Sequence, residues 1–257
     1  TLGVEYADVR AHVGDTESTG FCNVTGGSRT TFATGMAVTQ ACEDVIADCK
    51  RRAAMTWGLD EDQVEWEDGQ AIPGPGVNAD VKPLSLAELA GKAAKTGGPI
   101  QGRASLNAQG AGASFSVNFA DIRVDRETGK VDVLSYTAVQ DAGKAIHPAY
   151  VEGQMQGGAA QGLGWALNEE YIFDDEGILQ NAGFLDYRIP VASDLPMIDT
   201  HIVEVANPSH PFGVRGVGET PIVAPLAVTT NAVSRSLQQR ICELPLSPPR
   251  LLAEIDG

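Results

Sequence analysis

Glu219 is the residue in this chain that is best placed to take up a proton. A glycine-rich loop precedes it, and Thr220 and Pro221 follow it and open an apolar run that extends to about Leu237. We expect that run to be a helix with Thr220 as N-cap and Pro221 as its first residue. The loop glycines allow left-handed backbone and the close approach of a bulky ligand. They are Gly213, Gly216 and Gly218.

This position suits a general base. The positive end of a helix dipole favours an ionised carboxylate, whereas apolar neighbours such as Val217 and Ile222 disfavour it. A base that works near neutral pH needs such a balance. A surface loop with a capping glutamate would show the same local pattern, so the pattern alone leaves both interpretations open.

A second loop has the residues needed to hold an anion. It runs directly into a predicted helix from about Phe32 to Ala54, and its candidate binding residues are Gly26, Gly27, Ser28, Arg29, Thr30 and Thr31. The first N–H groups of a helix lack partners within it and bind phosphate readily. Arg29 could add a bidentate contact. The alternative is an ordinary helix start with an exposed arginine.

A predicted helix over 148–169 contains more glycine than helix propensity explains. Such glycines usually mark the close approach of another backbone or of a ligand. Gln154 and Gln161 lie two turns apart on roughly one face of this helix, so either side chain could reach a ligand. The glycines are Gly153, Gly157, Gly158, Gly162 and Gly164.

Composition excludes several classes of protein. The 257 residues carry a net charge of −16 spread along the chain, which argues against nucleic acid or an anionic membrane as partner. No apolar run approaches membrane-spanning length, and no signal peptide is visible. We therefore expect a cytoplasmic protein that holds any anionic ligand through local donors.

The cysteines and histidines give no metal-binding pattern. The four cysteines form no C-x-x-C pair, so an iron–sulfur or zinc site built by this chain alone is not expected. We predict that they are buried, reduced thiols. They are Cys22, Cys42, Cys49 and Cys242.

The remaining patterns predict an α+β fold, with antiparallel sheets and packed helices. Asp68-Gly69 indicates a hairpin turn, and Ser85 with Glu88 forms a capping box. Alternating residues from Phe115 to Val139 predict a long antiparallel hairpin, and further strands are expected near 171–173 and 200–205. We expect one region over 1–257, divided into subdomains 1–112 and 113–257.

Several segments, taken together, resemble the molybdenum hydroxylases, the xanthine dehydrogenase and aldehyde oxidase family. The resemblance covers nearly the whole chain and is to the C-terminal part of the molybdopterin-binding subunit. The combination of these motifs is specific for the family, although each motif alone is not. The segments are Gly26 to Thr31, Asp141-Ala142-Gly143, Ile146-His147-Pro148, Gly153-Gln154, Gln161 to Gly164, Gly216 to Glu219, Glu243 to Leu246 and Pro249 to Leu252.

The resemblance implies a cofactor and roles for particular residues. The cofactor would be molybdopterin cytosine dinucleotide with molybdenum, held through the pterin and not by protein ligands. Glu219 would be the catalytic base, next to Gly218, and Gln161, with Gln154, would contact the cofactor. The loop from Gly27 to Thr31 would contact the pterin or its phosphates. The reaction would hydroxylate an N-heterocycle or an aldehyde with oxygen from water.

The resemblance also implies partners. Electrons would leave through iron–sulfur clusters and an FAD carried by other chains, and the first molybdopterin-binding half is missing here. We therefore expect activity only in a heteromeric complex. His147 stands where asparagine is commoner in the family. Two alternatives stay open: a non-catalytic assembly module of the same fold, and an unrelated phosphate-binding α+β protein.

Overall fold

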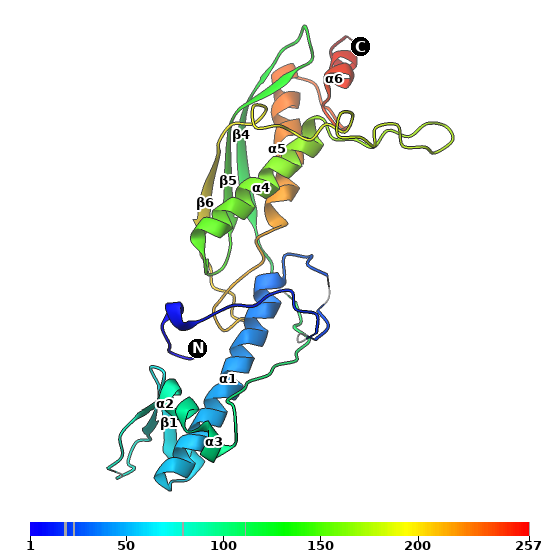
Figure 1. Ribbon diagram of the computed structural model, residues 1–257. Helices are drawn as coiled ribbons and strands as arrows, with labels where there is room; N and C mark the ends of the chain where they lie inside the picture. The colour runs from blue at the N-terminus through cyan, green and yellow to red at the C-terminus, as the bar shows by residue number, and fades with distance from the viewer. Residues whose placement is uncertain (18–19, 23, 79, 111, 257) are drawn as a thin grey trace. The chain divides into compact units, whose positions relative to one another are not determined.

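The computed structural model describes residues 1–17, 20–22, 24–78, 80–110 and 112–256 (Figure 1). Its contacts divide the chain into two units. The first contains Thr1–Val24 and Ala33–Gln109, and the second contains Thr25–Phe32 and Gly110–Gly257. The units part close to the predicted subdomain boundary after Gly112. However, the loop at 25–32 groups with the second unit, an assignment that its position in the sequence does not reveal.

The first unit contains most of the long helix α1 (Thr30–Trp57) and a small antiparallel sheet. The sheet consists of β1 (Val64–Glu67), β2 (Gln70–Pro73) and β3 (Leu84–Ser85), followed by the short helices α2 (Leu86–Gly91) and α3 (Ala93–Thr96). The 3₁₀ turns Tyr6–Asp8 and Glu61–Gln63 complete the unit.

Two local predictions in this unit are confirmed. Asp68 and Gly69 turn between β1 and β2 with φ of 45° and 78°, the left-handed values that a two-residue hairpin requires. The Ser85 hydroxyl accepts from the Glu88 N–H, and the Glu88 carboxylate accepts from the Ser85 N–H. Helix α2 ends at Gly91, and Lys92 lies between it and α3 as the C-cap of one and the N-cap of the other.

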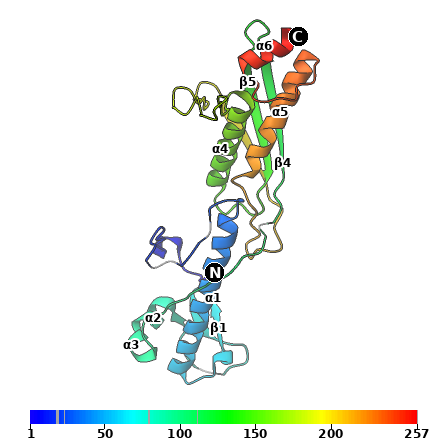
Figure 2. The same cartoon turned by 90° about the vertical axis from the view of Figure 1, so that its right-hand side faces the viewer.

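The second unit is a three-stranded sheet with helices on one face (Figures 1 and 2). The strands lie in the order β4 (Ser116–Val124), β5 (Val131–Asp141) and β6 (Ile198–Val203). Helices α4 (Pro148–Leu167) and α5 (Thr220–Leu237) pack on the sheet, and α6 (Pro248–Asp256) ends the chain. Tyr136 and Leu163 are fully buried in the core between these layers.

The α+β class is confirmed, with three corrections. β6 runs parallel to β5, so this sheet is mixed and not antiparallel. Residues 171–173 contribute only a single bridge, between Phe173 and Leu179. Helix α5 begins at Thr220, so its N-cap is Glu219 itself and not Thr220. Proline follows as the second helical residue, where a missing N–H also costs nothing.

The glycines of α4 let α5 approach closely, as their number predicted. A Cβ at Gly158 would lie 2.5 Å from Cγ of Pro221, and one at Gly162 would lie 2.7 Å from the carbonyl oxygen of Ile222. Neither distance can accommodate a side chain, so the two helices require glycine at both positions. By contrast, a Cβ at Gly157 would meet none of the described atoms within 4 Å.

The prediction of buried cysteines is wrong for most of them. Cys49 is buried, and burial raises the pKa of its thiol to about 11. Cys22 and Cys242 are exposed, and Cys42 is half-buried. In the described part of the chain, no helix is long and apolar enough to cross a membrane.

The α4–α5 contact predicts opposite effects for two glycine substitutions. Gly162→Ala should lower the free energy of unfolding by about 1–3 kcal/mol, the usual cost of overpacking. Gly157→Ala should raise it by up to about 1 kcal/mol, because alanine favours helix and the position is open. Urea unfolding followed by circular dichroism measures both. Equal effects of the two variants would contradict the close contact.

Candidate functional site

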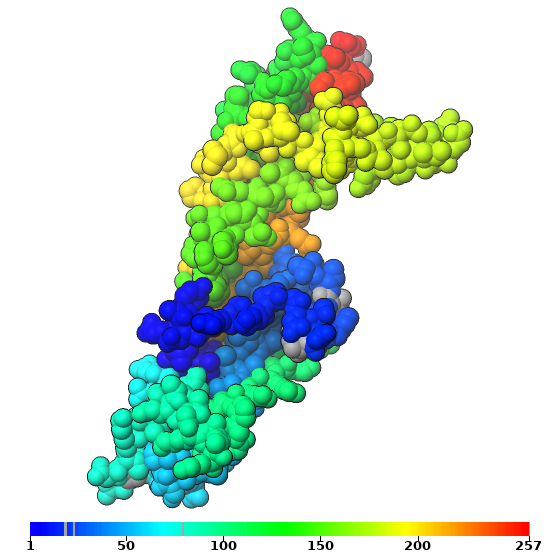
Figure 3. All heavy atoms as spheres, viewed as in Figure 1, coloured from blue at the N-terminus to red at the C-terminus, as the bar shows by residue number. Residues whose placement is uncertain are grey.

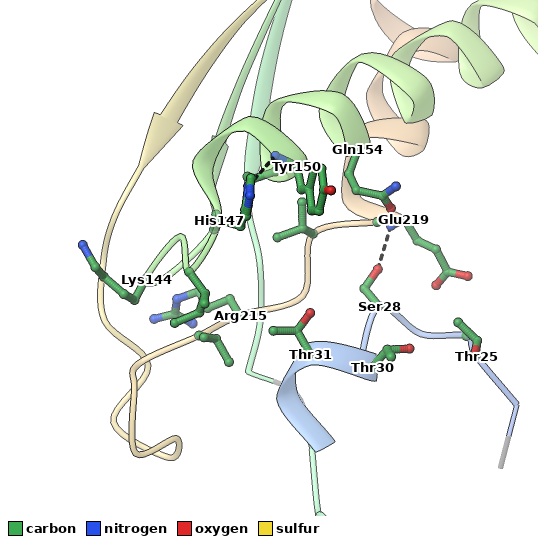
Figure 4. A pocket seen from close by; sticks show the side chains of 17 residues that line it. Thr25, Ser28, Thr30, Thr31, Lys144, His147, Tyr150, Gln154, Arg215 and Glu219 are labelled. Carbon is green, nitrogen blue, oxygen red and sulfur yellow. Dashed lines mark hydrogen bonds between the residues drawn. The ribbon is translucent and has the colours of Figure 1, made fainter. Parts of the chain in front are cut away.

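A cavity of about 530 Å³ lies within the second unit, where the loop before α1, the start of α4 and the loop before α5 meet (Figure 4). Its volume is within the range of small-molecule sites. These three segments come from widely separated parts of the sequence. The lining residues are Thr25, Gly26, Ser28, Thr30, Thr31, Ala142, Lys144, Ile146, His147, Tyr150, Val151, Gln154, Val214, Arg215, Val217, Gly218 and Glu219.

One hydrogen bond joins the two loops that the sequence singled out. The backbone N–H of Glu219 donates to Oγ of Ser28 at 2.6 Å (Figure 4). Ser28 has a φ of 57°, an uncommon value for a residue with a side chain, and Gly27 before it has 66°. A Cβ at Gly216 would lie 2.8 Å from Cβ of Ser28. Glycine there allows the loops to touch, which brings the Glu219 carboxylate to the donor-rich loop.

Gln154 is the α4 glutamine that reaches the cavity. A Cβ at Gly218 would lie 3.0 Å from its Oε1, and the side chains of Gln154 and Glu219 lie beside each other in Figure 4. Gln161, two turns further along α4, is exposed and is not among the lining residues. Its predicted contact with a ligand stays a prediction.

The rest of the donor loop divides between two cavities. Gly26, Thr30 and Thr31 line the main one. Gly27 lines an adjacent cavity of about 480 Å³ that shares Ser28 and Glu219 with the first. Arg29 lines neither cavity and is half-buried. The structure thus brings together most of this loop, Gln154, Gly218 and Glu219.

Two sets of contacts tie the Glu219 loop to the sheet and its neighbouring segments. Gln140, at the end of β5, is 1% exposed and donates from Nε2 to the carbonyl oxygen of Val217 at 3.2 Å. Arg215 pairs with Asp141 at 3.1 Å and donates to the carbonyl oxygens of Val205 and Ala113. The Glu219 loop is thus fixed at several points along its backbone and at Arg215.

The cationic side chains in the cavity wall already have carboxylate partners. Arg215 is paired with Asp141, and Lys144 with Glu204 at 3.1 Å. The Ala145 N–H and the Lys144 ammonium both bind the Glu204 carboxylate, which lowers its pKa below the ordinary value. An anion in this cavity would therefore depend on uncharged donors more than on formal charge.

His147 caps helix α4 beside the cavity. Its Nδ1 accepts from the backbone N–H of Tyr150 at 3.4 Å, and the two rings stack with centroids 4.0 Å apart. The histidine thus fills the N-cap position that a shorter polar residue often occupies. No local pattern pointed to Lys144, Tyr150 or Arg215 as cavity residues; they lie after β5, in the first turn of α4 and in the loop before α5.

The donor set suits phosphate. Ser28, Thr30 and Thr31 offer hydroxyls at the N-terminus of α1, where backbone N–H groups also lack helical partners. Gly26 and Gly218 permit a ligand to approach the main chain. Among the described residues, no group of three or more histidine, cysteine, aspartate or glutamate residues is arranged to hold a metal ion.

Comparison with known proteins places the chain in a family. Residues 1–196 match the model of the molybdopterin cofactor-binding domain, which is more than half of the chain. The chain therefore belongs to this family, as the motifs had indicated. The match ends before the Glu219 loop, so that loop is compared only through the full-length relatives.

Those relatives are subunits of molybdenum enzymes. The chain is 32% identical to the xanthine dehydrogenase molybdenum-binding subunit of Escherichia coli O157:H7, over 99% of the chain and 34% of that protein. It is 28% identical to the carbon monoxide dehydrogenase large chain of Hydrogenophaga pseudoflava, over 90% of the chain and 29% of that protein. The chain thus spans about a third of the length of these relatives.

Solved structures share the fold. A copper- and molybdenum-containing carbon monoxide dehydrogenase superposes with a TM-score of 0.81 at 26% identity, covering 93% of this chain and 31% of the other. Quinoline 2-oxidoreductase from Pseudomonas putida 86 gives a TM-score of 0.74 at 28% identity, covering 86% and 29%. The predicted membership of the molybdenum hydroxylases is confirmed.

The Ser28–Glu219 hydrogen bond can be tested with two substitutions. Ser28→Ala should lower the free energy of unfolding by about 1 kcal/mol, the net contribution of one hydrogen bond. Ser28→Gly loses the same bond but relieves the left-handed backbone by about 1–2 kcal/mol, so its stability should stay near or above that of the parent. Both variants should speed amide exchange at Glu219. Unchanged exchange in both would show that the bond does not hold the loop.

The Glu204 contacts predict a dependence on pH. Its pKa lies below the ordinary value of 4.5. The stabilisation is therefore complete above that value and is lost as the pH falls through the folded pKa. The amide proton shift of Ala145, followed by NMR, should report this transition, and Glu204→Gln should abolish it. A midpoint at or above 4.5 would contradict the assignment.

Proposed function

We propose that this chain is the part of a molybdenum hydroxylase that holds the molybdopterin cofactor and supplies the catalytic base. One observation carries the proposal most strongly: Glu219 lies in the wall of a cavity whose opposite loop offers phosphate donors. A capping glutamate on a plain surface would not share a cavity with these donors. The family membership makes molybdopterin the ligand to expect there.

The residues present fit this cofactor. The loop from Gly26 to Thr31 and the first turn of α1 would hold its phosphate groups, and Gln154 with the Gly218 backbone would contact the pterin part. We propose the cytosine dinucleotide form. When bound, the cofactor supplies the molybdenum redox centre that takes two electrons from the substrate.

Glu219 would accept the proton that water-derived oxygen loses during hydroxylation. The backbone N–H of Glu219 donates to the Ser28 hydroxyl, and this hydrogen bond fixes the main chain from which the Glu219 side chain extends. It is exposed to the cavity and lies at the N-terminus of α5. From this position the carboxylate can reach a reacting group bound in the cavity, which a general base requires.

The reaction also requires a substrate and partner chains. The reaction class implies an N-heterocycle or an aldehyde as substrate, with iron–sulfur clusters and FAD on partner chains. Phe212 could have stacked on an aromatic substrate, but it lines neither cavity, and its N–H is bound to the ring nitrogen of His210. The proposal therefore does not choose between the two substrate classes.

Glu219→Gln tests the base. In the complete complex, turnover should fall about 10²- to 10⁴-fold, the usual contribution of a general base. Molybdenum and bound cytosine nucleotide should stay at parent levels, because the amide keeps the shape of the side chain. Glu152→Gln, an exposed carboxylate on α4 outside the cavity, is the control and should leave turnover unchanged. Undiminished turnover of Glu219→Gln would refute the assignment.

The two glutamines of α4 test the cofactor contact. Gln154→Ala should lower the molybdenum and cytosine nucleotide bound per complex, since its side chain lines the cavity. Gln161→Ala measures the second predicted contact on the same helix in the same way. Full cofactor content in Gln154→Ala would contradict the proposed binding mode. Loss in both variants would support both contacts.

A further inference from the structure

Residues 170–197, which we call the arm, leave the end of α4 and return to the start of β6. Figure 3 shows part of the arm, in yellow-green, projecting from its own unit, whereas Leu195 near its end packs against the core of that unit. Large apolar side chains are exposed along the arm. They include Phe184 at 102%, Leu185 at 94% and Met197 at 84%, with Phe173, Ile178 and Ile189 at about 60%.

The arm is held in shape by polar contacts of its own. The Asn181 side chain accepts from the Ile172 N–H at 3.0 Å and donates to the Glu170 carbonyl oxygen at 2.6 Å. The Asp174 carboxylate accepts from the N–H of Ile178 at 2.8 Å. The segment therefore has a defined fold that does not depend on burying its apolar side chains.

Two further contacts anchor the base of the arm. The Tyr171 ring lies against that of Tyr187, with centroids 5.5 Å apart. Glu170 pairs with Arg250 of α6. A shaped segment that presents apolar side chains to solvent is the usual form of a protein interaction site. Covering these apolar side chains would lower the free energy of an isolated chain in water.

Charge on the arm indicates what kind of surface covers it. Arg188 is its one basic residue, whereas six acidic residues lie along it: Glu170, Asp174, Asp175, Glu176, Asp186 and Asp194. A partner surface should be apolar at its centre and basic at its rim. A second copy of this chain, with a net charge of −16, offers the wrong sign.

The relatives supply a candidate of the required size. The chain matches 34% of the xanthine dehydrogenase subunit, so about two thirds of such a protein has no counterpart here. We propose that the arm docks on the polypeptide that provides this remaining part. The identity of that partner rests on the function proposed above, whereas the docking role of the arm rests on its own exposure and shape.

Photo-cross-linking in the complete protein tests the contact. A benzophenone amino acid replaces Phe184, and adducts are identified by mass spectrometry after irradiation. We expect adducts with peptides outside the 257 residues of this sequence. Adducts confined to this chain would overturn the proposal, and isotope-mixed preparations would show whether they come from the same copy or a second one.

Trypsin cleavage after Arg188 provides a second measurement. In the complete protein the docked arm should resist cleavage. The double variant Phe184→Ser/Leu185→Ser should be cut at least 10-fold faster, because its apolar contact is lost. Gln239→Ser/Arg240→Ser, two exposed residues just after α5, is the matched control and should be cut at the parent rate. Equal rates in all three proteins would overturn the proposal.

The same preparations separate this inference from the proposed function. Molybdenum and cytosine nucleotide are measured on the parent protein that gives the cross-links. Adducts outside the chain without molybdenum would refute the function and leave the docking role standing. Molybdenum present with adducts only inside the chain would refute the docking role and leave the function standing.

Discussion

The hydrogen bond from the Glu219 N–H to the Ser28 hydroxyl is the contact on which the site depends. It joins a loop near the start of the chain to one near its end. It requires left-handed backbone at Ser28 and a glycine at position 216, since any side chain at 216 would collide with Ser28. Without this contact, the carboxylate and the phosphate donors would not share one cavity.

A second close approach, between helices α4 and α5, supports this contact. Gly158 and Gly162 let α5 lie directly against α4, and this places the start of α5, with Glu219 as its N-cap, beside Gln154. Gln140 then reaches from the sheet to the loop carbonyls. The packing of α5 on α4 therefore also sets the position of the Glu219 loop, and both depend on glycines where main chains come close together.

Much of this could be predicted locally. The hairpin at Asp68-Gly69, the capping box at Ser85 and the long β4–β5 hairpin follow from turn chemistry and residue alternation, which act over a few residues. The direction of β6 could not be predicted. The residues of a six-residue strand do not indicate whether it pairs parallel or antiparallel with its neighbour. The parallel pairing of β6 with β5 is set by the chain that connects them.

The sequence by itself determined the candidates: the glycine-flanked Glu219, the donor loop from Gly26 to Thr31, and the glycine-rich helix. Residue type and spacing carry that information because helix termini and glycine backbones bind ligands in known ways. Only the tertiary structure decided which candidates meet. It brought Gln154 but not Gln161 into the cavity and added Lys144 and Arg215, because a helix face and a sheet edge acquire neighbours only when the layers pack.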